Sequence, residues 1–289
     1  MKVIDAFQKD SPAISFEFFP PKTAEQEAKL FAVITELKEF APDFVSVTYG
    51  AMGNTREKSF FWVREIKQRY GLEPVAHLTC VAATRESIAS HLAELRQSGV
   101  ENILALRGDP PQDQPDFVPP AKGFKLAKEL IAFIKKEQPA FCLGAAGFPE
   151  GHPRSPGPLK DIEYLKEKVD AGAEYVITQL FFDNHHYFAF VKRCEQAGLR
   201  VPIIPGLMPI TNFHQIKKLT SVCGATLPAD LLAKLEEHQS DQPAINRIGV
   251  EHSIEQAREL LAAGVKGLHF FVMNQSGPIA AILSELPVR

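Results

Sequence analysis

The chain has 289 residues, 45% of them hydrophobic, and is long enough to bury one sizeable core. The formal net charge is −3 and no basic cluster stands out, so the sequence speaks against nucleic acid and against an anionic membrane surface as partners. The first ten residues lack the apolar core of a signal peptide, and no later run reaches the roughly 18 apolar residues of a membrane span, which predicts a cytoplasmic protein.

The first strand-like run extends from Ile14 to Pro21 and carries one acid, Glu17, among apolar neighbours. Period-two alternation separates this run into two faces, with Ile14, Phe16 and Phe18 on one and Ser15, Glu17 and Phe19 on the other. An unpaired buried carboxylate costs several kcal/mol. Glu17 is therefore paired, solvated in a polar cavity or held protonated for chemistry, unless it lies on an edge strand and faces water.

Strand and helix patterns alternate along the rest of the chain. Further strands are predicted at residues 43–49, 74–80, 101–106, 141–147, 174–182, 201–206 and 267–273. Apolar residues at helical spacing predict helices through residues 28–37, 55–70, 84–99, 122–136, 159–171, 187–194, 212–222, 227–238, 243–263 and 275–286. Thr23 and Thr84 are expected to cap two of these helices, and glycines end several of them.

Eight strand-helix units predict a parallel sheet closed into a single (β/α)8 TIM barrel, an α/β fold. The helical pattern is richer than one unit requires after the seventh strand, so extra helices are expected there. No Gly-x-Gly-x-x-Gly follows the first strand, which excludes the Rossmann alternative. No linker divides the chain, and we expect one domain over residues 1–289.

In a barrel of this kind the loops that follow the strands build the site. The polar residues near the predicted strand ends are Glu17, Thr48, His77, Arg107, Asp109, Gln179 and Asn274. Each could instead have a structural role, as a backbone ligand, a core imidazole, a helix cap or a local ion pair. Together, with several aromatic residues, they describe a pocket for a flat polar heterocycle.

Several kinds of chemistry are excluded by missing motifs. The nine histidines include no His-x-x-x-His pair, so no metal site is predicted. No serine nucleophile elbow and no Walker loop occur. Two long loops, up to Pro120 and from Phe148 to Pro158, interrupt the regular pattern, and loops of this length are often functional.

Several short motifs occur in order along the chain: Ser-Phe-Glu-Phe-Phe-Pro-Pro at 15–21, Val-Thr-Tyr-Gly at 47–50, His-Leu-Thr-Cys at 77–80, Ala-Leu-Arg-Gly-Asp at 105–109, Lys-Val-Asp-Ala-Gly-Ala at 168–173, Ile-Thr-Gln at 177–179 and Pro-Gly at 205–206. This series closely resembles the methylenetetrahydrofolate reductase family, in its short bacterial type. The resemblance covers nearly the whole chain.

The resemblance implies an FAD-dependent barrel. Such an enzyme takes hydride from NADH or NADPH and passes it through the flavin to 5,10-methylenetetrahydrofolate, giving 5-methyltetrahydrofolate for methionine synthesis. The two substrates use one site in turn, and the assembly is expected to be a homo-oligomer. Two alternatives stay open: a pterin-binding methyl-transfer barrel without flavin, and a catalytically inactive folate-binding subunit.

The resemblance also assigns residues. It makes Glu17 the general acid and Asp109 a second catalytic acid that tunes the flavin, while Gln179, Phe213 and Gln275 join Glu17 in substrate binding. It places the flavin against Thr48, His77, Arg107, Gly108, Asp109, Ala146, Phe148, His152, Asp161 and Lys168. Two positions depart from the family pattern, with Phe148 in place of a tyrosine and Gln275 in place of an arginine.

A general acid has to hold a proton at neutral pH. An ordinary glutamate, with a pKa of about 4.3, would be ionised there, so its pKa would have to rise by about three units. We expect this rise to come from desolvation and from the negative charge of Asp109, with the desolvating groups being Phe16, Phe18, Phe19 and Phe182.

Overall fold

The computed structural model of the chain describes residues 1–48, 54–109, 118 and 120–288, without the side chains of residues 54–58. Parts of two predicted features, the motif at 47–50 and the Pro-rich loop up to Pro120, lie outside these ranges. Within the described ranges no helix is long and apolar enough to cross a membrane.

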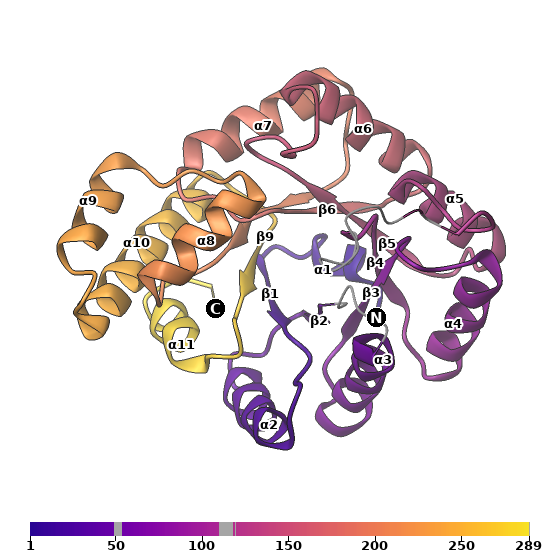
Figure 1. Cartoon of the computed structure of the whole chain (residues 1–289), viewed down its shortest axis with the longest axis horizontal. Coiled ribbons are helices and arrows are strands. Elements are labelled where there is room, and N and C mark those ends of the chain that lie inside the picture. Colours follow the sequence, from indigo (N-terminus) through magenta and orange to yellow (C-terminus); the bar gives the residue numbers. More distant parts are fainter. Residues whose placement is uncertain (49–53, 110–117, 119, 289) are drawn as a thin grey trace.

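Nine parallel strands form one sheet in the order β7-β6-β5-β4-β3-β2-β1-β9-β8. Their bounds are β1 Ala13–Phe18, β2 Phe44–Val47, β3 Pro74–Thr79, β4 Asn102–Leu106, β5 Cys142–Gly147, β6 Tyr175–Thr178, β7 Ile203–Ile204, β8 Gly206–Leu207 and β9 Gly267–Phe271. The sheet curves into a nearly closed barrel surrounded by helices, which confirms the predicted fold class (Figure 1).

The barrel closes at the seventh predicted strand, which is divided into two short ones. β7 pairs with β6 and β8 pairs with β9, so the two ends of the sheet are separated in the chain only by Pro205. Proline has no N–H group for the sheet, and the change of partner occurs at this residue. The Pro205 carbonyl still accepts a hydrogen bond from the His269 N–H at 3.0 Å.

The helices that cover the barrel are α2 Ala24–Lys38, α3 Asn54–Glu65 with a π-helical end at Ile66–Tyr70, α4 Arg85–Gln97, α5 Ala127–Glu137, α6 Pro158–Asp170, α7 Asn184–Gln196, α8 Phe213–Cys223, α9 Ala229–Glu237, α10 Gln242–Ala262 and α11 Ser276–Ser284. Thr23 and Thr84 cap α2 and α4 as predicted. α8, α9 and α10 all lie between β8 and β9, on one side of the barrel (left in Figure 1).

The sixth strand is shorter than predicted, because the chain leaves the sheet after Thr178. Two side chains of α10 bind the backbone carbonyls that follow the strand. Gln256 Nε2 bonds the Phe181 carbonyl and His252 Nε2 bonds the Phe182 carbonyl, both at 2.9 Å. The apolar run at 180–182 therefore packs beside α10 instead of extending the strand.

The strands have two differently packed faces. Phe16 and Phe18 point outward into the core shared with the helices, whereas Phe44, Val75 and Tyr175 fill the lower interior. A short helix that the sequence analysis did not predict, α1 Val3–Ala6, packs into this lower interior. Four residues are too few to show a helical period, so α1 could not be predicted from its pattern.

Candidate active site

Glu17 lies inside the barrel, 6% exposed, among polar groups from the neighbouring strands. Its Oε1 accepts a hydrogen bond from the Thr48 hydroxyl at 2.9 Å, and its Oε2 accepts one from the Ser46 hydroxyl at 3.3 Å. The Nε2 atoms of His269 and His77 lie 3.3 and 3.5 Å from Oε2. The edge-strand reading of Glu17 is therefore excluded, because the carboxylate is buried and paired.

Strand register explains this cluster. Glu17 on β1 lies beside Ser46 on β2, and Ser15 lies beside His269 on β9. Alternation along each strand points these side chains inward, while Phe16 and Phe18 point outward. Ser15, Ser46 and His269 were missed by the sequence analysis, which collected only residues at strand ends. Their signal was a polar residue at an inward position within an apolar strand.

The environment of Glu17 differs from the expected one. Burial by itself would raise its pKa, but the charge of His77, together with the charge of His269 and hydrogen bonds from His269 and Thr48, lowers the pKa to about 2. The expected increase was wrong, because Phe16 and Phe18 face the helices and Phe182 packs in a separate cluster with Phe213. Phe19 lies beyond the strand and is 36% exposed.

A chain of hydrogen bonds leads from Glu17 to the backbone. The Ser15 hydroxyl lies 3.3 Å from the Leu268 carbonyl, to which it donates, and 2.9 Å from His269 Nδ1. The ring of His269 thus connects Ser15, at Nδ1, with Glu17 Oε2, which lies 3.3 Å from Nε2.

His77 is 4% exposed, and burial lowers the pKa of its imidazole, against the opposing effect of Glu17. Neither of its ring nitrogens has a hydrogen-bond partner among the described residues. A buried imidazole that lacks partners loses the hydrogen bonds it made in water, and such groups are rare in folded proteins. His77 therefore has donor and acceptor capacity left for a ligand inside the barrel.

The β5–α6 loop, residues 148–157, forms a second group of predicted site residues. The backbone N–H of His152 donates to the Asp161 carboxylate, burial raises the pKa of Asp161, and the Phe148 ring lies 4.7 Å from the His152 ring. Lys168 Nζ donates to the Ala146 carbonyl at 2.5 Å, and burial lowers the pKa of Lys168 to about 8. These five residues lie together over the end of β5.

The His152 ring has an assigned tautomer. Its Nδ1 accepts from the Arg154 N–H at 3.0 Å, so in the neutral ring Nε2 carries the hydrogen. Burial is the main cause that lowers the pKa of His152, followed by the charge of Arg107. His152 is thus a neutral hydrogen-bond donor near neutral pH.

The motif at 107–109 directly follows β4. Gly108 has φ +77°, and a Cβ atom on it would lie 2.9 Å from a methyl group of Val81. Only glycine fits this position without strain. The Arg107 guanidinium lies 3.5 Å from Asp109 Oδ1, and the Asp109 side chain is 77% exposed. Asp109 is therefore at the surface of the site and not in the interior beside Glu17.

The remaining predicted residues lie farther around the rim. Gln179 directly follows β6, and its side-chain oxygen accepts from the Leu180 N–H at 2.9 Å. Phe213 begins α8 and is only 4% exposed, under Lys217, whose Nζ lies 5.1 Å from the ring centre. Gln275 precedes α11 and makes no side-chain cap. Asn274 bonds both the N–H and the carbonyl of Phe19, which joins the ends of β1 and β9.

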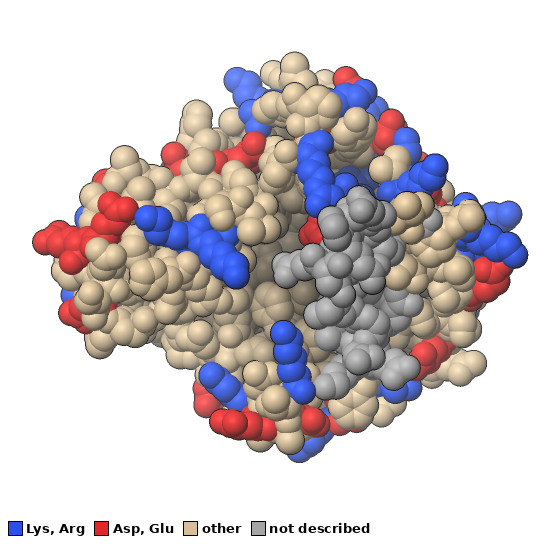
Figure 2. Space-filling view, in the orientation of Figure 1, with Lys and Arg blue, Asp and Glu red and all other residues tan. Residues whose placement is uncertain are grey.

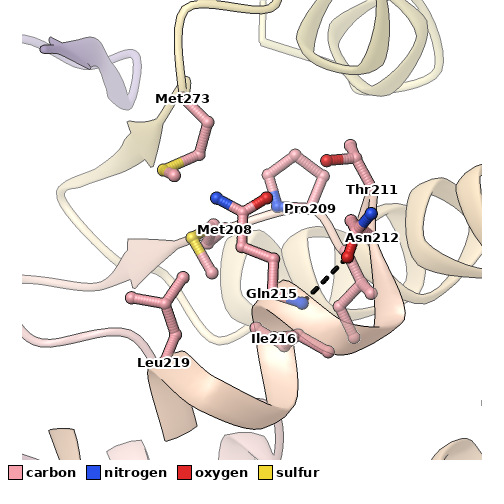
Figure 3. Close-up of a pocket in the computed structure, with 9 residues that line it drawn as sticks. Met208, Pro209, Thr211, Asn212, Gln215, Ile216, Leu219 and Met273 are labelled. Atoms are coloured by element: carbon pink, nitrogen blue, oxygen red, sulfur yellow. Dashed lines mark hydrogen bonds between the residues drawn. The ribbon is translucent and has the colours of Figure 1, made fainter. Parts of the chain in front are cut away.

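A small pocket lies between the first turns of α8 and the segment after β9 (Figure 3). It is lined mainly by apolar side chains, with Thr211, Asn212 and Gln215 as polar members; the lining residues are Met208, Pro209, Ile210, Thr211, Asn212, Gln215, Ile216, Leu219 and Met273. The sequence analysis did not identify it. Its only signal was the position of Met208 and Met273 just after two strand ends.

Figure 2 shows a hollow in this face of the molecule, with lysine and arginine side chains at its rim. The motif at 107–109, the β5–α6 loop and Gln179 follow the carboxyl ends of parallel strands, where barrel sites are built. Glu17 and His77 lie within β1 and β3, close to the same ends. Among the described residues no group of three or more His, Cys, Asp or Glu side chains is arranged to hold a metal ion.

Comparisons with known proteins agree with this arrangement. The family model for methylenetetrahydrofolate reductase matches residues 2–287. The 5,10-methylenetetrahydrofolate reductase of Salmonella typhimurium is 37% identical over 96% of this chain and 91% of its own length. Methylenetetrahydrofolate reductase (NADH) 1 of Arabidopsis thaliana is 36% identical over 99% of this chain, which spans about half the length of that plant relative.

A solved structure shares the fold at low sequence identity. A protein from Clostridium thermocellum, described as binding two copies of 5-methyl-5,6,7,8-tetrahydrofolic acid, superposes with a TM-score of 0.69 at 18% identity. The aligned parts cover 97% of this chain and 95% of that one. The match of the family model over almost every residue, together with the Salmonella relative, establishes that the chain belongs to the methylenetetrahydrofolate reductase family.

Proposed function

We propose that residues 1–289 act as one flavin-binding catalytic unit that reduces 5,10-methylenetetrahydrofolate to 5-methyltetrahydrofolate with NADH or NADPH. The observation that carries the proposal is a buried, paired carboxylate, Glu17, at the centre of a barrel whose family model matches residues 2–287. The Arabidopsis relative is named as an NADH enzyme and the Clostridium protein is described as binding a methyltetrahydrofolate, which supports a nicotinamide donor and a folate ligand. By family resemblance we extend the proposal to a cytoplasmic homo-oligomer whose product feeds methionine synthesis.

The described residues fit FAD. Inside the barrel, the His77 nitrogens have no hydrogen-bond partner among the described residues, and Gly108 presents backbone without a side chain. Outside it, His152 Nε2–H is a neutral donor and Lys168 is a cation fixed over β5, suited to the ribityl and phosphate parts. We propose Thr48, Arg107, Asp109, Ala146, Phe148 and Asp161 as the further contacts. When bound, the flavin supplies the hydride acceptor and donor.

Glu17 supplies the proton in this proposal. Its carboxylate is ionised near neutral pH, and His269 Nε2 lies 3.3 Å from Oε2 while Ser15 contacts the other ring nitrogen, so we propose that the two residues share the proton. Delivered to the bridging nitrogen of the folate, this proton lets the carbon–nitrogen bond break, with the electron pair staying on nitrogen. The resulting iminium carbon then accepts hydride.

Three side chains at the rim of the barrel are proposed to orient the substrate. Gln179 is placed to hydrogen-bond the pterin, since its side-chain NH2 group has no partner among the described residues and its oxygen bonds only Leu180. Phe213 is proposed to pack against either substrate, which requires its buried ring to become exposed. Gln275 lacks the guanidinium fork that best binds a carboxylate, so we expect a weak contact with the glutamate tail of the folate.

The test is to purify the protein, release any cofactor by denaturation, and then mix the native protein with NADH without oxygen. We expect released FAD, bleaching of the flavin absorbance by NADH, and recovery of that absorbance on adding methylenetetrahydrofolate. Protein without flavin would contradict the proposal and favour the methyl-transfer barrel. Bound flavin that NADH fails to bleach would favour the inactive folate-binding subunit.

A further inference from the structure

The β5–α6 loop is attached to the far end of α8. Glu150, in the middle of this loop, accepts hydrogen bonds from the backbone N–H of Thr226 at 3.1 Å and from its hydroxyl at 2.6 Å. Thr226 lies three residues beyond Cys223, where α8 ends. The two partners are 76 residues apart in the chain, so this contact joins two separate parts of the rim.

Glu150 is unusual for a loop acid, because its side chain is only 10% exposed. The remaining polar contact comes from His186 at the start of α7, whose Nε2 lies 3.5 Å from Glu150 Oε2 and 3.4 Å from the Thr226 hydroxyl. The hydroxyl gives its hydrogen to Glu150, so it accepts from His186 Nε2–H. A largely buried carboxylate that accepts from both the N–H and the hydroxyl of one residue holds that residue in one geometry.

Two further contacts attach the same loop. The Pro149 carbonyl accepts from Arg193 Nη2 of α7 at 3.1 Å. Gly224, which ends α8 with φ +77°, lies so close to Pro153 that a Cβ atom would be 3.1 Å from Pro153 Cγ. The loop thus contacts α7 through Pro149 and Glu150, and the end of α8 through Glu150 and Pro153.

The other end of α8 forms one wall of the pocket in Figure 3. Gln215, Ile216 and Leu219 line the pocket from α8, and Phe213 begins the helix. An α-helix of 11 residues is a rigid rod about 16 Å long. A shift of its C-terminal end is therefore transmitted to the pocket wall.

We propose that Glu150 is a positioning residue that couples the β5–α6 loop to α8, so that a cofactor held by the loop sets the position of the pocket wall that receives the substrate. This inference rests on the proposed function, which assigns the β5–α6 loop to FAD and Phe213, the first residue of α8, to substrate binding. Coupling of this kind is reciprocal, so each ligand raises the affinity for the other by the same factor.

The test measures the dissociation constant of 5-methyltetrahydrofolate for apoprotein and for FAD-loaded protein, by titration. We expect FAD to tighten folate binding in the unchanged chain by about fivefold or more. Glu150→Gln keeps the size of the side chain but removes its charge, and Thr226→Val removes the hydroxyl from the other side. Each variant should reduce the factor by which FAD tightens folate binding at least threefold, and the double variant should reduce this factor little further.

Glu163→Gln on α6 is the matched control, since this acid is exposed and pairs only with Lys160 among the described residues. It should keep the coupling factor of the unchanged chain. A purely structural role would lower the melting temperature of the Glu150 and Thr226 variants and leave the factor unchanged, which would overturn the inference, as would a factor of one in the unchanged chain. Failure to bind FAD at all would instead contradict the proposed function and remove the basis of this inference with it.

Discussion

The contacts of Glu17 determine which proton the site can hold. Two imidazole nitrogens lie within 3.5 Å of Oε2, and a threonine hydroxyl lies 2.9 Å from Oε1. These groups favour the carboxylate over the carboxylic acid. In the proposed reaction, a proton supplied by Glu17 would therefore be shared with His269, so that the two residues would act together as the acid.

Glu17→Gln removes the acid and keeps the volume of the side chain. We expect bleaching of the flavin by NADH to stay within about threefold of the unchanged rate, and reduction of methylenetetrahydrofolate to fall by 10² to 10⁴, the usual contribution of a general acid. Stopped-flow absorbance measures both half-reactions separately. Retention of both would exclude Glu17 as the acid. Ser46→Ala, which removes only a long 3.3 Å contact to Oε2, is the control and should change neither rate tenfold.

Asp109→Asn tests the second predicted acid. The side chain is 77% exposed beside Arg107, so its charge is screened by water and salt. Removing a negative charge near a flavin favours the reduced, more negative form. We expect the midpoint potential to rise by on the order of 10–30 mV and folate reduction to slow. A spectroelectrochemical titration that finds the same potential in both proteins would remove the tuning role.

At the scale of elements, α10 approaches the chain between β8 and α8 at a glycine. A Cβ atom on Gly249 would lie 1.9 Å from the Ile210 carbonyl oxygen, which is far inside contact distance. Gln256 and His252 on the same helix hold the carbonyls after β6. α10 thus supports both segments that carry Gln179 and the pocket residues to the rim.

Gly249→Ala should separate α10 from the Ile210 segment. We expect the free energy of unfolding to fall by about 2 kcal/mol or more, and KM for the folate to rise, because the segment at 208–212 lines the pocket. Urea unfolding and steady-state kinetics measure the two effects. Gly277→Ala on α11 is the matched control, since its added methyl group meets no atom within 4 Å. An unchanged stability for Gly249→Ala would contradict the close approach.

The limits of sequence-based prediction differ between elements. β1 to β5 and β9 were predicted well, because buried parallel strands are apolar runs ended by turn residues. β6 was predicted too long, since the bonds from Gln256 and His252 that stop it come from a distant helix. The site residues differ in the same way, between those with a local sequence signal and those placed by distant contacts. Glu17 was found by its local contrast, whereas His269, 252 residues away, and the pocket depend on tertiary packing.

For the whole molecule, the buried titratable groups predict a pH dependence of stability. The pKa of Glu17 is lowered from 4.5 to about 2, so its stabilising effect is present above pH 4.5 and lost as the pH falls toward 2. The pKa of His77 is lowered as well, so the unfolded chain binds a proton first and stability decreases as the pH falls below 6.5.

We therefore expect the free energy of unfolding to decrease from pH 7 to pH 3, with protonation of Glu17 accounting for about 2 kcal/mol of the decrease below pH 4.5. Urea unfolding at a series of pH values measures this. In Glu17→Gln the decrease between pH 4.5 and 3 should be shallower than in the unchanged chain. Parallel curves for the two proteins in that range would show that the carboxylate is not held in its charged form.

The filling of the lower interior by α1, Phe44, Val75 and Tyr175 has a kinetic consequence. Among the described residues it leaves the rim as the way into the barrel, so both reactants of the proposed reaction must enter and leave through the same opening. The oxidised nicotinamide must therefore leave before the folate can bind. Excess NADH should therefore slow turnover by occupying the entrance, and raising the folate concentration should relieve this inhibition.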